Sequence, residues 1–462
     1  MKISVENLGV LRKAEFEVGD LTIICGANNT GKTYATYALH GFLDYWQEAG
    51  ITQLLTSKKI KELLKKGVIE ISLSDIVSYV QRVCYSYHNY IPMFFATSKE
   101  HFVNTRFDVI LPEISIDKID KTITYGNSRS KLIYNINKND EDKMIKIFIL
   151  EHKGIKENKV NIELLKNSIS RDILSIIYYQ ILPIPFAISI ERTGAAMFRK
   201  ELDFTRNRLL AHISNPDSNI APTELLNTYY KYGYPVPVNK DVDFIRGLED
   251  IGKNIGEIAK KNPEIISLFN SITGGKYKSS IEGLYFIPDK SNAKLTMGDS
   301  SSSIRSLLSL GFYIKHLAKP NDLLMLDEPE LNLHPQNQRK LARLLARLVN
   351  AGVKVYITTH SDYILKEFNT LILMKNQTIR KAQLLEKYGY HENELLDSNR
   401  IKAYIAKKAL VEVEDTKKKQ KINTFVKAPI TQNGIEIDEF DTTINDMNVI
   451  QDDLLFGGIN YD

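Results

Sequence analysis

The sequence is poor in cysteine and tryptophan: its 462 residues include only two cysteines and one tryptophan. Two cysteines cannot build a disulfide framework, and neither belongs to a pattern of zinc ligands. Cys25 also lies within an apolar run that is predicted to be a buried strand, while Cys84 stands alone. The composition fits a reducing compartment, so we expect a cytoplasmic protein.

Membrane-spanning and secretory segments are also missing from the sequence. The longest uncharged run, residues 173–190, contains Gln180, Pro183 and Pro185, and the prolines divide it into a helix end and a following strand. The first residues carry charge early and have no apolar signal-peptide core. We therefore expect no membrane association.

Neither sign of charge dominates the sequence. The formal net charge is +5 and the pI is about 8.7, with 25% charged and 43% hydrophobic residues, as in an ordinary globular protein. Such a mild basic excess permits DNA binding without indicating it, so DNA stays an open question. The length suits two or three domains, or one large domain with insertions.

What the sequence does contain is a complete P-loop, Gly26-Ala-Asn-Asn-Thr-Gly-Lys-Thr33. It follows an apolar, β-branched run (21–25) and precedes a helix-forming segment (34–39), an order that points backbone N–H groups and a helix N-terminus at phosphates. A simple glycine-rich turn is the alternative, but the flanking elements favour nucleotide binding. Lys32 would reach the β- and γ-phosphates of ATP, and Thr33 would offer its hydroxyl to Mg²⁺. The expected ATP-binding residues are Gly26, Asn28, Asn29, Thr30, Gly31, Lys32 and Thr33.

A second motif supplies two carboxylates. The four apolar residues 323–326 predict a strand buried in a parallel sheet, and Asp327 and Glu328 follow at its carboxyl end, as in a Walker B motif. We expect Asp327 to ligate Mg²⁺ beside Thr33, and Glu328 to act as the general base that polarises the attacking water. A surface strand that ends in two acids is the alternative. The continuation Pro329-Glu-Leu-Asn-Leu-His-Pro335 favours the ATPase interpretation.

A second buried strand, residues 353–359, ends in His360. ABC-type heads place a switch histidine there, in contact with the γ-phosphate, and the order and spacing after the carboxylate motif favour this role over a surface histidine. A Q-loop glutamine cannot be identified, and Gln81 and Gln180 are candidates only by elimination.

The Leu-Ser-Gly-Gly signature of ABC proteins is absent. In its place, residues 297–303 read Met-Gly-Asp-Ser-Ser-Ser-Ser and precede an apolar-periodic helix over 304–317. Serine hydroxyls and free N–H groups at a helix start bind phosphate oxygens, so we expect Ser301 and Ser302 to contact ATP bound to a partner subunit. A multiply capped helix is the alternative, and which serine reaches the nucleotide stays open.

The succession of elements predicts an α/β fold. Two strands and a turn precede the P-loop, which matches ABC-type P-loop ATPase heads, whose mixed sheet is accompanied by an antiparallel subsheet. Helices are expected over 41–100 and 195–270, antiparallel strands over 105–165, and a turn or edge segment at Tyr232–Val238. The expected parts are an N-terminal lobe with the P-loop (1–190), a helical insertion (191–275), a C-terminal lobe with signature helix, Walker B, D-loop and switch histidine (276–375), and a small C-terminal assembly or partner region (376–462).

Taken together, these motifs resemble the AAA-15/OLD-like branch of ABC ATPases. The resemblance covers residues 1–40 and 185–375 and is weaker elsewhere. Further segments resemble the ATPase subunit of PARIS anti-phage systems, namely Ile190–Gly194, Tyr232–Pro237, Gly274–Tyr277 and His360–Tyr363.

The resemblance implies a cytoplasmic homo-oligomer with composite ATP sites, which holds a separate Toprim-type nuclease until a phage-derived trigger releases it. The Septu ATPase is similar and would bring an HNH-type nuclease instead. The rival functions are a RecF- or Rad50-like DNA-repair ATPase, although long heptads are missing, and a non-hydrolysing scaffold with structural ATP. The nuclease is expected on a separate chain, because neither acidic segment of this one fits a Toprim site. Val411–Asp415 lacks the required glycine, and Asp438–Asp441 lacks the Asp-x-Asp spacing.

Assembly contacts are expected from the insertion and from the tail. After Lys427 the chain has eight acidic residues and no basic one, so its end could meet a basic stripe on another subunit or on the nuclease. An ordinary amphipathic helix that packs on its own core is the alternative for that stripe. The stripe and its apolar neighbours comprise Arg192, Arg199, Lys200, Arg206, Arg208, Met197, Phe198, Leu202 and Phe204.

Overall fold

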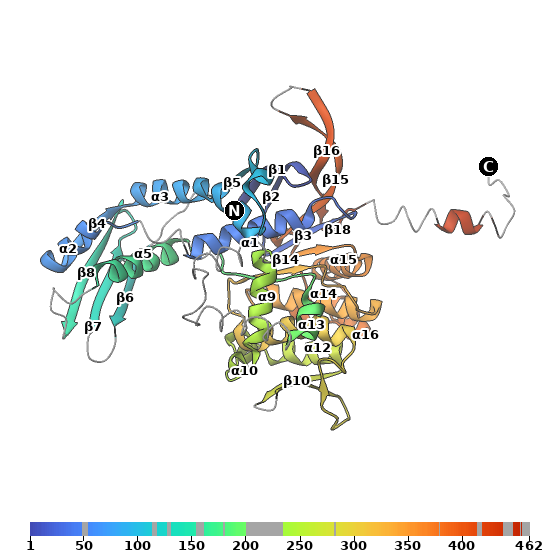
Figure 1. Cartoon of the computed structure of the whole chain (residues 1–462). Coiled ribbons are helices and arrows are strands. Elements are labelled where there is room, and N and C mark those ends of the chain that lie inside the picture. The colour runs from blue at the N-terminus through green and yellow to red at the C-terminus, as the bar shows by residue number, and fades with distance from the viewer. Residues whose placement is uncertain are drawn as a thin grey trace, which may run out of the picture. The chain divides into compact units, whose positions relative to one another are not determined.

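The computed structural model describes residues 1–48, 54–112, 118–126, 131–153, 161–178, 181–199, 234–280, 283–377, 379–413, 418–437, 447–452 and 454. Its chain forms two compact units, which are described separately (Figure 1). The first comprises residues 1–3, 41–91 and 107–184, and the second comprises residues 4–40, 92–106 and 185–462.

The first unit is built on a four-stranded antiparallel sheet in the order β4-β8-β7-β6. Every second residue of β7 is buried, because one face of the sheet packs against apolar side chains and the other meets solvent. The antiparallel strands predicted over 105–165 are therefore present, whereas β4 interrupts the stretch predicted to be helical. The elements of this unit are α2 (Ser57–Lys66), β4 (Val68–Ser72), α3 (Leu73–Ser86), η1 (Tyr87–Tyr90), β6 (Ile119–Gly126), β7 (Lys131–Lys138), β8 (Met144–Lys153) and α5 (Ile162–Tyr178).

The second unit contains a six-stranded sheet in the order β16-β15-β3-β14-β13-β9. Its five strands from β15 to β9 are parallel, and β16 pairs antiparallel with β15. All residues of β3 and β13 are buried, as expected for inner strands covered on both faces. The strands are β3 (Leu21–Gly26), β9 (Pro185–Ile188), β13 (Leu323–Asp327), β14 (Lys354–Thr359), β15 (Ile401–Val413) and β16 (Lys418–Lys427).

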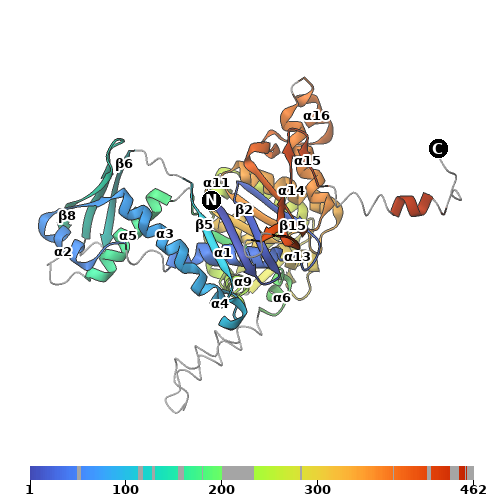
Figure 2. The ribbon, with the colours of Figure 1, turned by 90° about the horizontal axis from the view of Figure 1, so that it is seen from above.

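Smaller strands accompany this sheet. A hairpin of β1 (Lys2–Leu8) and β2 (Leu11–Glu17) precedes the P-loop strand (Figure 2), and β2 contacts β16. The α/β fold with a mixed sheet and antiparallel strands, predicted for an ABC-type P-loop ATPase head, is thereby confirmed. β5 (Arg106–Ile110) belongs almost wholly to the first unit. The remaining strands of the second unit are β10 (Gly275–Ser280), β11 (Gly283–Pro288), β12 (Leu295–Thr296), β17 (Ile430–Thr431) and β18 (Gly434–Ile435).

Helices surround the central sheet, and their apolar faces join β3, β13 and β14 in one hydrophobic core. α13 passes directly into a π-helical turn, η4, before the β13 strand begins. The remaining helices are α1 (Lys32–Glu48), α4 (Ile91–Phe94), η2 (Lys99–Phe102), α6 (Arg192–Met197), α9 (Val236–Arg246), α10 (Leu248–Ile251), α11 (Glu257–Lys261), α12 (Pro263–Thr273), α13 (Ser302–Phe312), η4 (Tyr313–Leu317), α14 (Pro335–Asn350), α15 (Asp362–Asn376), α16 (Lys381–Tyr388), η5 (Glu392–Glu394) and η6 (Ser398–Arg400).

Two features differ from expectation. The segment around Pro235 and Pro237 is not a turn or edge segment beyond its first residues, because Val236 already begins α9; proline fits there, since the first helical turn needs no N–H donors. Part of the region predicted to serve assembly or partner contacts (376–462) also belongs to the central sheet. β15 pairs with the P-loop strand β3, so residues 401–427 complete the ATPase sheet.

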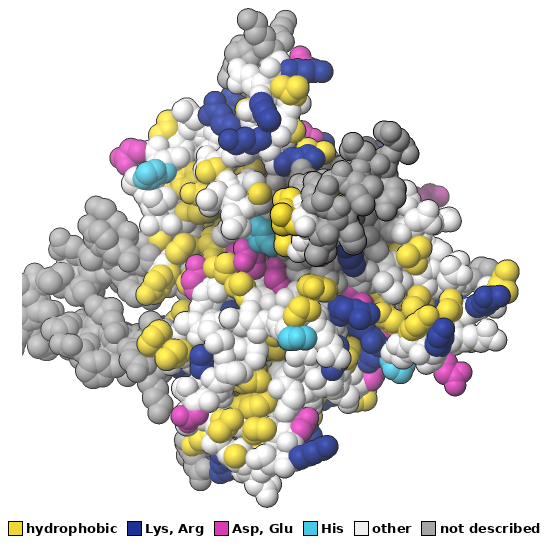
Figure 3. All heavy atoms as spheres, turned by 90° about the vertical axis from the view of Figure 1, so that its right-hand side faces the viewer, with side chains coloured by type: hydrophobic (Ala, Val, Ile, Leu, Met, Phe, Trp, Pro, Cys, Tyr) yellow, Lys and Arg dark blue, Asp and Glu magenta, His cyan; other side chains and the backbone are white. Residues whose placement is uncertain are grey.

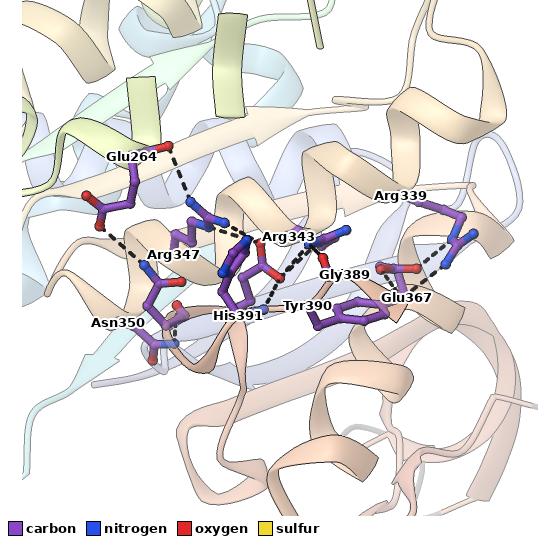
Figure 4. A network of polar contacts seen from close by, with 11 residues as sticks. Glu264, Arg339, Arg343, Arg347, Asn350, Glu367, Gly389, Tyr390 and His391 are labelled. Carbon is purple, nitrogen blue, oxygen red and sulfur yellow. Dashed lines mark hydrogen bonds and ion pairs between the residues drawn. The ribbon is translucent and has the colours of Figure 1, made fainter. Parts of the chain in front are cut away.

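A row of arginines on α14 connects this helix to α15 and to the segment after α16 (Figure 4). Arg339 donates to Glu367 at 2.6 Å, while Arg343 and Arg347 both donate to Glu394. The two glutamate side chains are 1% and 0% exposed, so each buried carboxylate needs these partners to offset its lost hydration. The spacing of four residues places the arginines on one helix face.

No described helix is both long and apolar enough to cross a bilayer.

Candidate nucleotide site

The P-loop joins β3 to α1, and its two glycines are needed for steric reasons. Gly26 has φ +132°, and a Cβ there would lie 2.3 Å from the carbonyl oxygen of Ala406 on β15. Gly31 has φ +98°, and its Cβ would lie 2.4 Å from Leu11 Cγ. Any larger residue would therefore displace the neighbouring strand or the hairpin.

The polar side chains of the loop differ in exposure and in hydrogen-bond partners. Asn28 and Asn29 are exposed at the tip, and the Thr30 hydroxyl closes the turn by donating to the carbonyl oxygen of Ala27 at 2.8 Å. Lys32 Nζ donates to the carbonyl oxygens of Gly26 and Ala27 at 3.0 and 2.9 Å. Burial lowers the pKa of Lys32, and the carboxylates of the site oppose that shift.

Asp327 and Thr33 meet at the carboxyl edge of the sheet. The Thr33 hydroxyl donates to Asp327 Oδ2 at 3.2 Å, and the hydroxyl of Thr358 on β14 donates to Oδ1. Asp327 is only 2% exposed, and burial raises its pKa. A hydroxyl and a carboxylate are the hard oxygen donors that Mg²⁺ prefers, so this pair fits the predicted metal position.

Glu328 stands beside His360, as the predicted base beside the predicted switch residue. Glu328 Oε1 lies 3.4 Å from His360 Nε2, close enough for charge attraction although the alignment is poor for a hydrogen bond. The contact with His360 lowers the pKa of Glu328 and keeps the carboxylate ionised. The two side chains are 23% and 28% exposed, so a water molecule or phosphate can reach them from solvent.

Glu330 belongs to the same cluster, although its role was not predicted. Its Oε1 accepts a hydrogen bond from the backbone N–H of His360 at 2.6 Å, which fixes the loop after β14. Burial raises the pKa of Glu330. The Asp-Glu-Pro-Glu sequence was the available signal, because it placed a third acid next to the Walker B pair.

Arg192 is a second site residue that the sequence did not reveal. It was assigned to an exposed basic stripe, but its side chain is 3% exposed and lies inside the second unit. Its guanidinium donates to the carbonyl oxygens of Asp327 (2.8 Å) and Glu328 (2.6 Å). Further bonds reach the carbonyl oxygens of Ser189 and Ser306, both at 3.0 Å. Arg192 therefore ties the Walker B turn to β9 and to α13.

The rest of the predicted stripe is only partly described. Arg199 is paired with Glu249, and Met197 and Phe198 are 47% and 52% exposed. The remaining stripe residues, Lys200, Leu202, Phe204, Arg206 and Arg208, lie outside the described residues.

The serine-rich segment forms the start of α13 as predicted. Ser301 is the N-cap, and its hydroxyl accepts from the N–H of Ile304 at 3.4 Å. Ser301 and Ser302 are exposed, and within the described ranges no hydrogen bond joins either one to the P-loop of the same chain. The intrachain geometry thus leaves these serines free to face another molecule.

The structure does not test either candidate for the Q-loop glutamine. Gln81 lies on α3 in the first unit, and Gln180 lies outside the described residues. The strand next to β13 is β9, which is followed by Glu191. Burial and then the charge of Glu191 raise the pKa of Tyr37 on α1, so a carboxylate occupies this edge of the site.

Comparison with known proteins agrees with the motif assignment. The AAA_15 model, described as an AAA ATPase domain, matches residues 1–365. A segment of 73 residues is 38% identical to the ABC multidrug transporter SNQ2 of Candida glabrata, which is 15% of this chain and 5% of that protein.

Solved structures similar to this chain include heads of SMC proteins. An SmcHead bound to the C-winged helix domain of ScpA is 15% identical with a TM-score of 0.32, covering 79% of this chain and 90% of that one. An Smc head with an extended coiled coil, bound to the C-terminal domain of ScpA derived from Pyrococcus furiosus, is 14% identical with a TM-score of 0.33, covering 97% and 98%.

Proposed function

This chain belongs to the AAA_15 family of AAA ATPase domains, and from that premise we propose that it binds ATP with Mg²⁺ and hydrolyses the terminal phosphoanhydride bond. The observation that carries the proposal is the meeting of Thr33, Asp327, Glu328 and His360 at one sheet edge beside the P-loop. These residues come from the start of α1 and from the carboxyl ends of two strands, β13 and β14, which are far apart in the sequence.

Each residue has a distinct role in the proposed reaction. Lys32 and the P-loop N–H groups hold the phosphates, while Thr33 and Asp327 would hold Mg²⁺, which neutralises phosphate charge when bound. Glu328 accepts a proton from the attacking water, and ADP and inorganic phosphate leave. His360 donates to the γ-phosphate through Nε2, the nitrogen that faces the cluster.

We also propose that this ATPase regulates an anti-phage complex as a homo-oligomer, holding a separate nuclease of Toprim or HNH type until infection releases it. The motif resemblance to PARIS and Septu ATPases supports this. The neighbouring gene and proteins that co-purify with the tagged chain test it, since a nuclease in both places is expected. Tight, steeply salt-dependent binding of duplex DNA without a nuclease partner would favour the DNA-repair alternative.

Lys32→Ala and Glu328→Gln separate the proposed binding and chemical roles. Lys32→Ala removes a phosphate contact, so it should weaken ATP binding measured by equilibrium titration. Glu328→Gln should leave ATP affinity intact and reduce turnover about 10²–10⁴-fold, because only the group that orients water is changed. Equal loss of ATP affinity in both variants would contradict these roles, and unchanged turnover in Glu328→Gln would contradict hydrolysis at this site.

A further inference from the structure

A second cavity lies in the same unit as the ATPase sheet but is formed by other elements. It encloses about 390 Å³ between α12, the β10–β11 hairpin and the end of α13. Phe269, Tyr277 and Phe312 supply aromatic walls, and two of these rings are 3% and 4% exposed. Apolar walls of this kind favour an apolar or aromatic side chain as occupant.

The rim of the cavity is cationic. Lys276, Lys278 and Lys315 line it, and no carboxylate among the described residues does. Within the described part of the chain, none of these lysines has an ion pair, whereas Lys253 and Lys261 of the same unit are paired with Asp250 and Glu257. Three unpaired ammonium groups around one cavity favour an anionic occupant.

His316 does not add to this charge. It lies against Phe312, with ring centroids 5.3 Å apart, and its Nδ1 faces the carbonyl oxygen of Asn254. Burial lowers the pKa of His316, so its ring contributes an uncharged wall at neutral pH. The cavity thus combines an aromatic interior with a lysine rim.

The end of this chain has the complementary composition. Met447, Val449, Ile450 and Leu454 are 55%, 58%, 58% and 80% exposed, so these apolar side chains lack a packing partner. The sequence at 452–456 reads Asp-Asp-Leu-Leu-Phe, with two acids directly before three apolar residues. An exposed apolar group flanked by charge is typical of a docking segment.

We propose that the cavity binds the tail segment Asp452–Phe456 of this chain. The leucine and phenylalanine side chains enter between the aromatic walls, and the two aspartates meet the lysine rim. Residues 447–452 are helical in the structure, and residues 438–446 before them span at most roughly 30–32 Å when extended, which sets the reach of the segment from Ile437. The acidic tail therefore has its partner at this cavity and not at Arg192, which is buried, or Arg199, which is paired.

Peptide binding to the full-length chain tests the proposal. The host is the chain with Leu454→Ser and Phe456→Ser, which weakens its own tail, and the probe is a fluorescein-labelled peptide of residues 447–462. Fluorescence anisotropy should rise to saturation and weaken with added salt. Adding Lys276→Gln and Lys278→Gln to the host should reduce affinity roughly fivefold or more, since two charge pairs are lost. The matched host carries Lys253→Gln and Lys261→Gln and should bind like the parent.

Three outcomes of the peptide-binding experiment would overturn the proposal. The first is equal loss of affinity in both lysine-substituted hosts, which would indicate non-specific charge attraction. The second is unchanged binding of a peptide that carries the Leu454→Ser and Phe456→Ser changes, because the cavity would then recognise charge alone. The third is full displacement by equimolar pyrophosphate, which would assign the rim to small anions.

In the unmodified chain, carbodiimide coupling should join Asp452 or Asp453 to Lys276, Lys278 or Lys315, and its absence would equally contradict the proposal.

Discussion

Glu328 has a backbone conformation that is unfavourable for a glutamate. Its φ is +47°, and residues held in the left-handed region cost on the order of 1–3 kcal/mol. Two contacts hold it there: its N–H donates to the Thr358 hydroxyl at 3.1 Å, and its carbonyl oxygen accepts from Arg192 at 2.6 Å. Residues from β14 and from the start of α6 therefore hold the proposed base in this unfavourable backbone conformation.

Arg192 should consequently act as a positioning residue for Glu328. Arg192→Lys keeps the charge but cannot reach four carbonyl oxygens, so turnover should fall about 10²-fold, as for a misplacement of roughly 1 Å. ATP affinity should change little. In the Glu328→Gln background the same substitution should cause no further loss of turnover, because the group that it positions is already gone.

Steady-state and single-turnover ATPase assays on the four combinations check this prediction. The control is Arg246→Lys, since Arg246 is also mostly buried but is paired with Asp243 at 2.8 Å. Independent, multiplicative losses from Arg192→Lys and Glu328→Gln would show that Arg192 acts elsewhere.

The roles of individual residues could be predicted from the sequence where the reacting groups belong to one short local motif. Lys32, Thr33, Asp327 and Glu328 could be assigned because each belongs to a short pattern with a known order. Arg192 could not, because its function depends on contacts with residues more than a hundred positions away.

At the scale of helices and strands, the buried carboxylate of Asp241 joins α9 to α13 and to the end of β9. Asp241 on α9 is 1% exposed and accepts hydrogen bonds from Ser309 on α13 at 2.8 Å and from Ser189, directly after β9, at 3.3 Å. Arg192 contributes a nearby positive charge. The helical insertion is thereby connected to the signature helix and to the strand beside Walker B.

Burial raises the pKa of Asp241 to about 6, which makes this connection sensitive to pH. The folded state binds a proton that the unfolded state, with an ordinary pKa near 4, releases between about pH 4 and pH 6. The contribution of Asp241 to stability is therefore present below about pH 4 and is lost as pH rises through 6, by roughly 2–3 kcal/mol.

Asp241→Asn should flatten the change in unfolding free energy over this window, because asparagine does not titrate. Urea denaturation of both proteins at pH 4.5, 5.5 and 7 measures the difference. A variant whose stability changes with pH in parallel with the parent would contradict the raised pKa. Ser309→Ala, which leaves the titrating group in place, should retain the pH dependence and serves as the control.

The elements that could be predicted are those whose apolar residues recur at a regular spacing along the sequence. The sequence of α14 (Pro335–Asn350) predicts a helix, because Pro335 suits the first helical turn and the apolar spacing is regular. β15 and β16 were taken for part of a separate tail region, because lysines interrupt their apolar pattern. Their pairing with β3 depends on a contact between the two ends of the chain, which local sequence does not encode.

At the scale of the whole molecule, one chain supplies an incomplete set of groups around the proposed ATP site. The P-loop, Asp327, Glu328 and His360 converge, but the exposed serines at the start of α13 make no described hydrogen bond to that cluster. Phosphoryl transfer depends mainly on positioning and charge stabilisation, so a partly open site should hydrolyse ATP slowly. We therefore expect turnover per chain to rise with protein concentration as paired heads form.

Complementation between two inactive variants tests this composite site. Lys32→Ala chains keep their serines but lack a working P-loop, whereas Ser301→Ala, Ser302→Ala chains have the opposite defect. Each protein alone should be nearly inactive. In a symmetric pair, a mixed dimer contains one complete site, so an equimolar mixture should recover about a quarter of the parent turnover. A mixture that is only as active as the sum of its parts, or a parent whose turnover per chain is independent of concentration while it is monomeric, would show that each chain hydrolyses ATP alone.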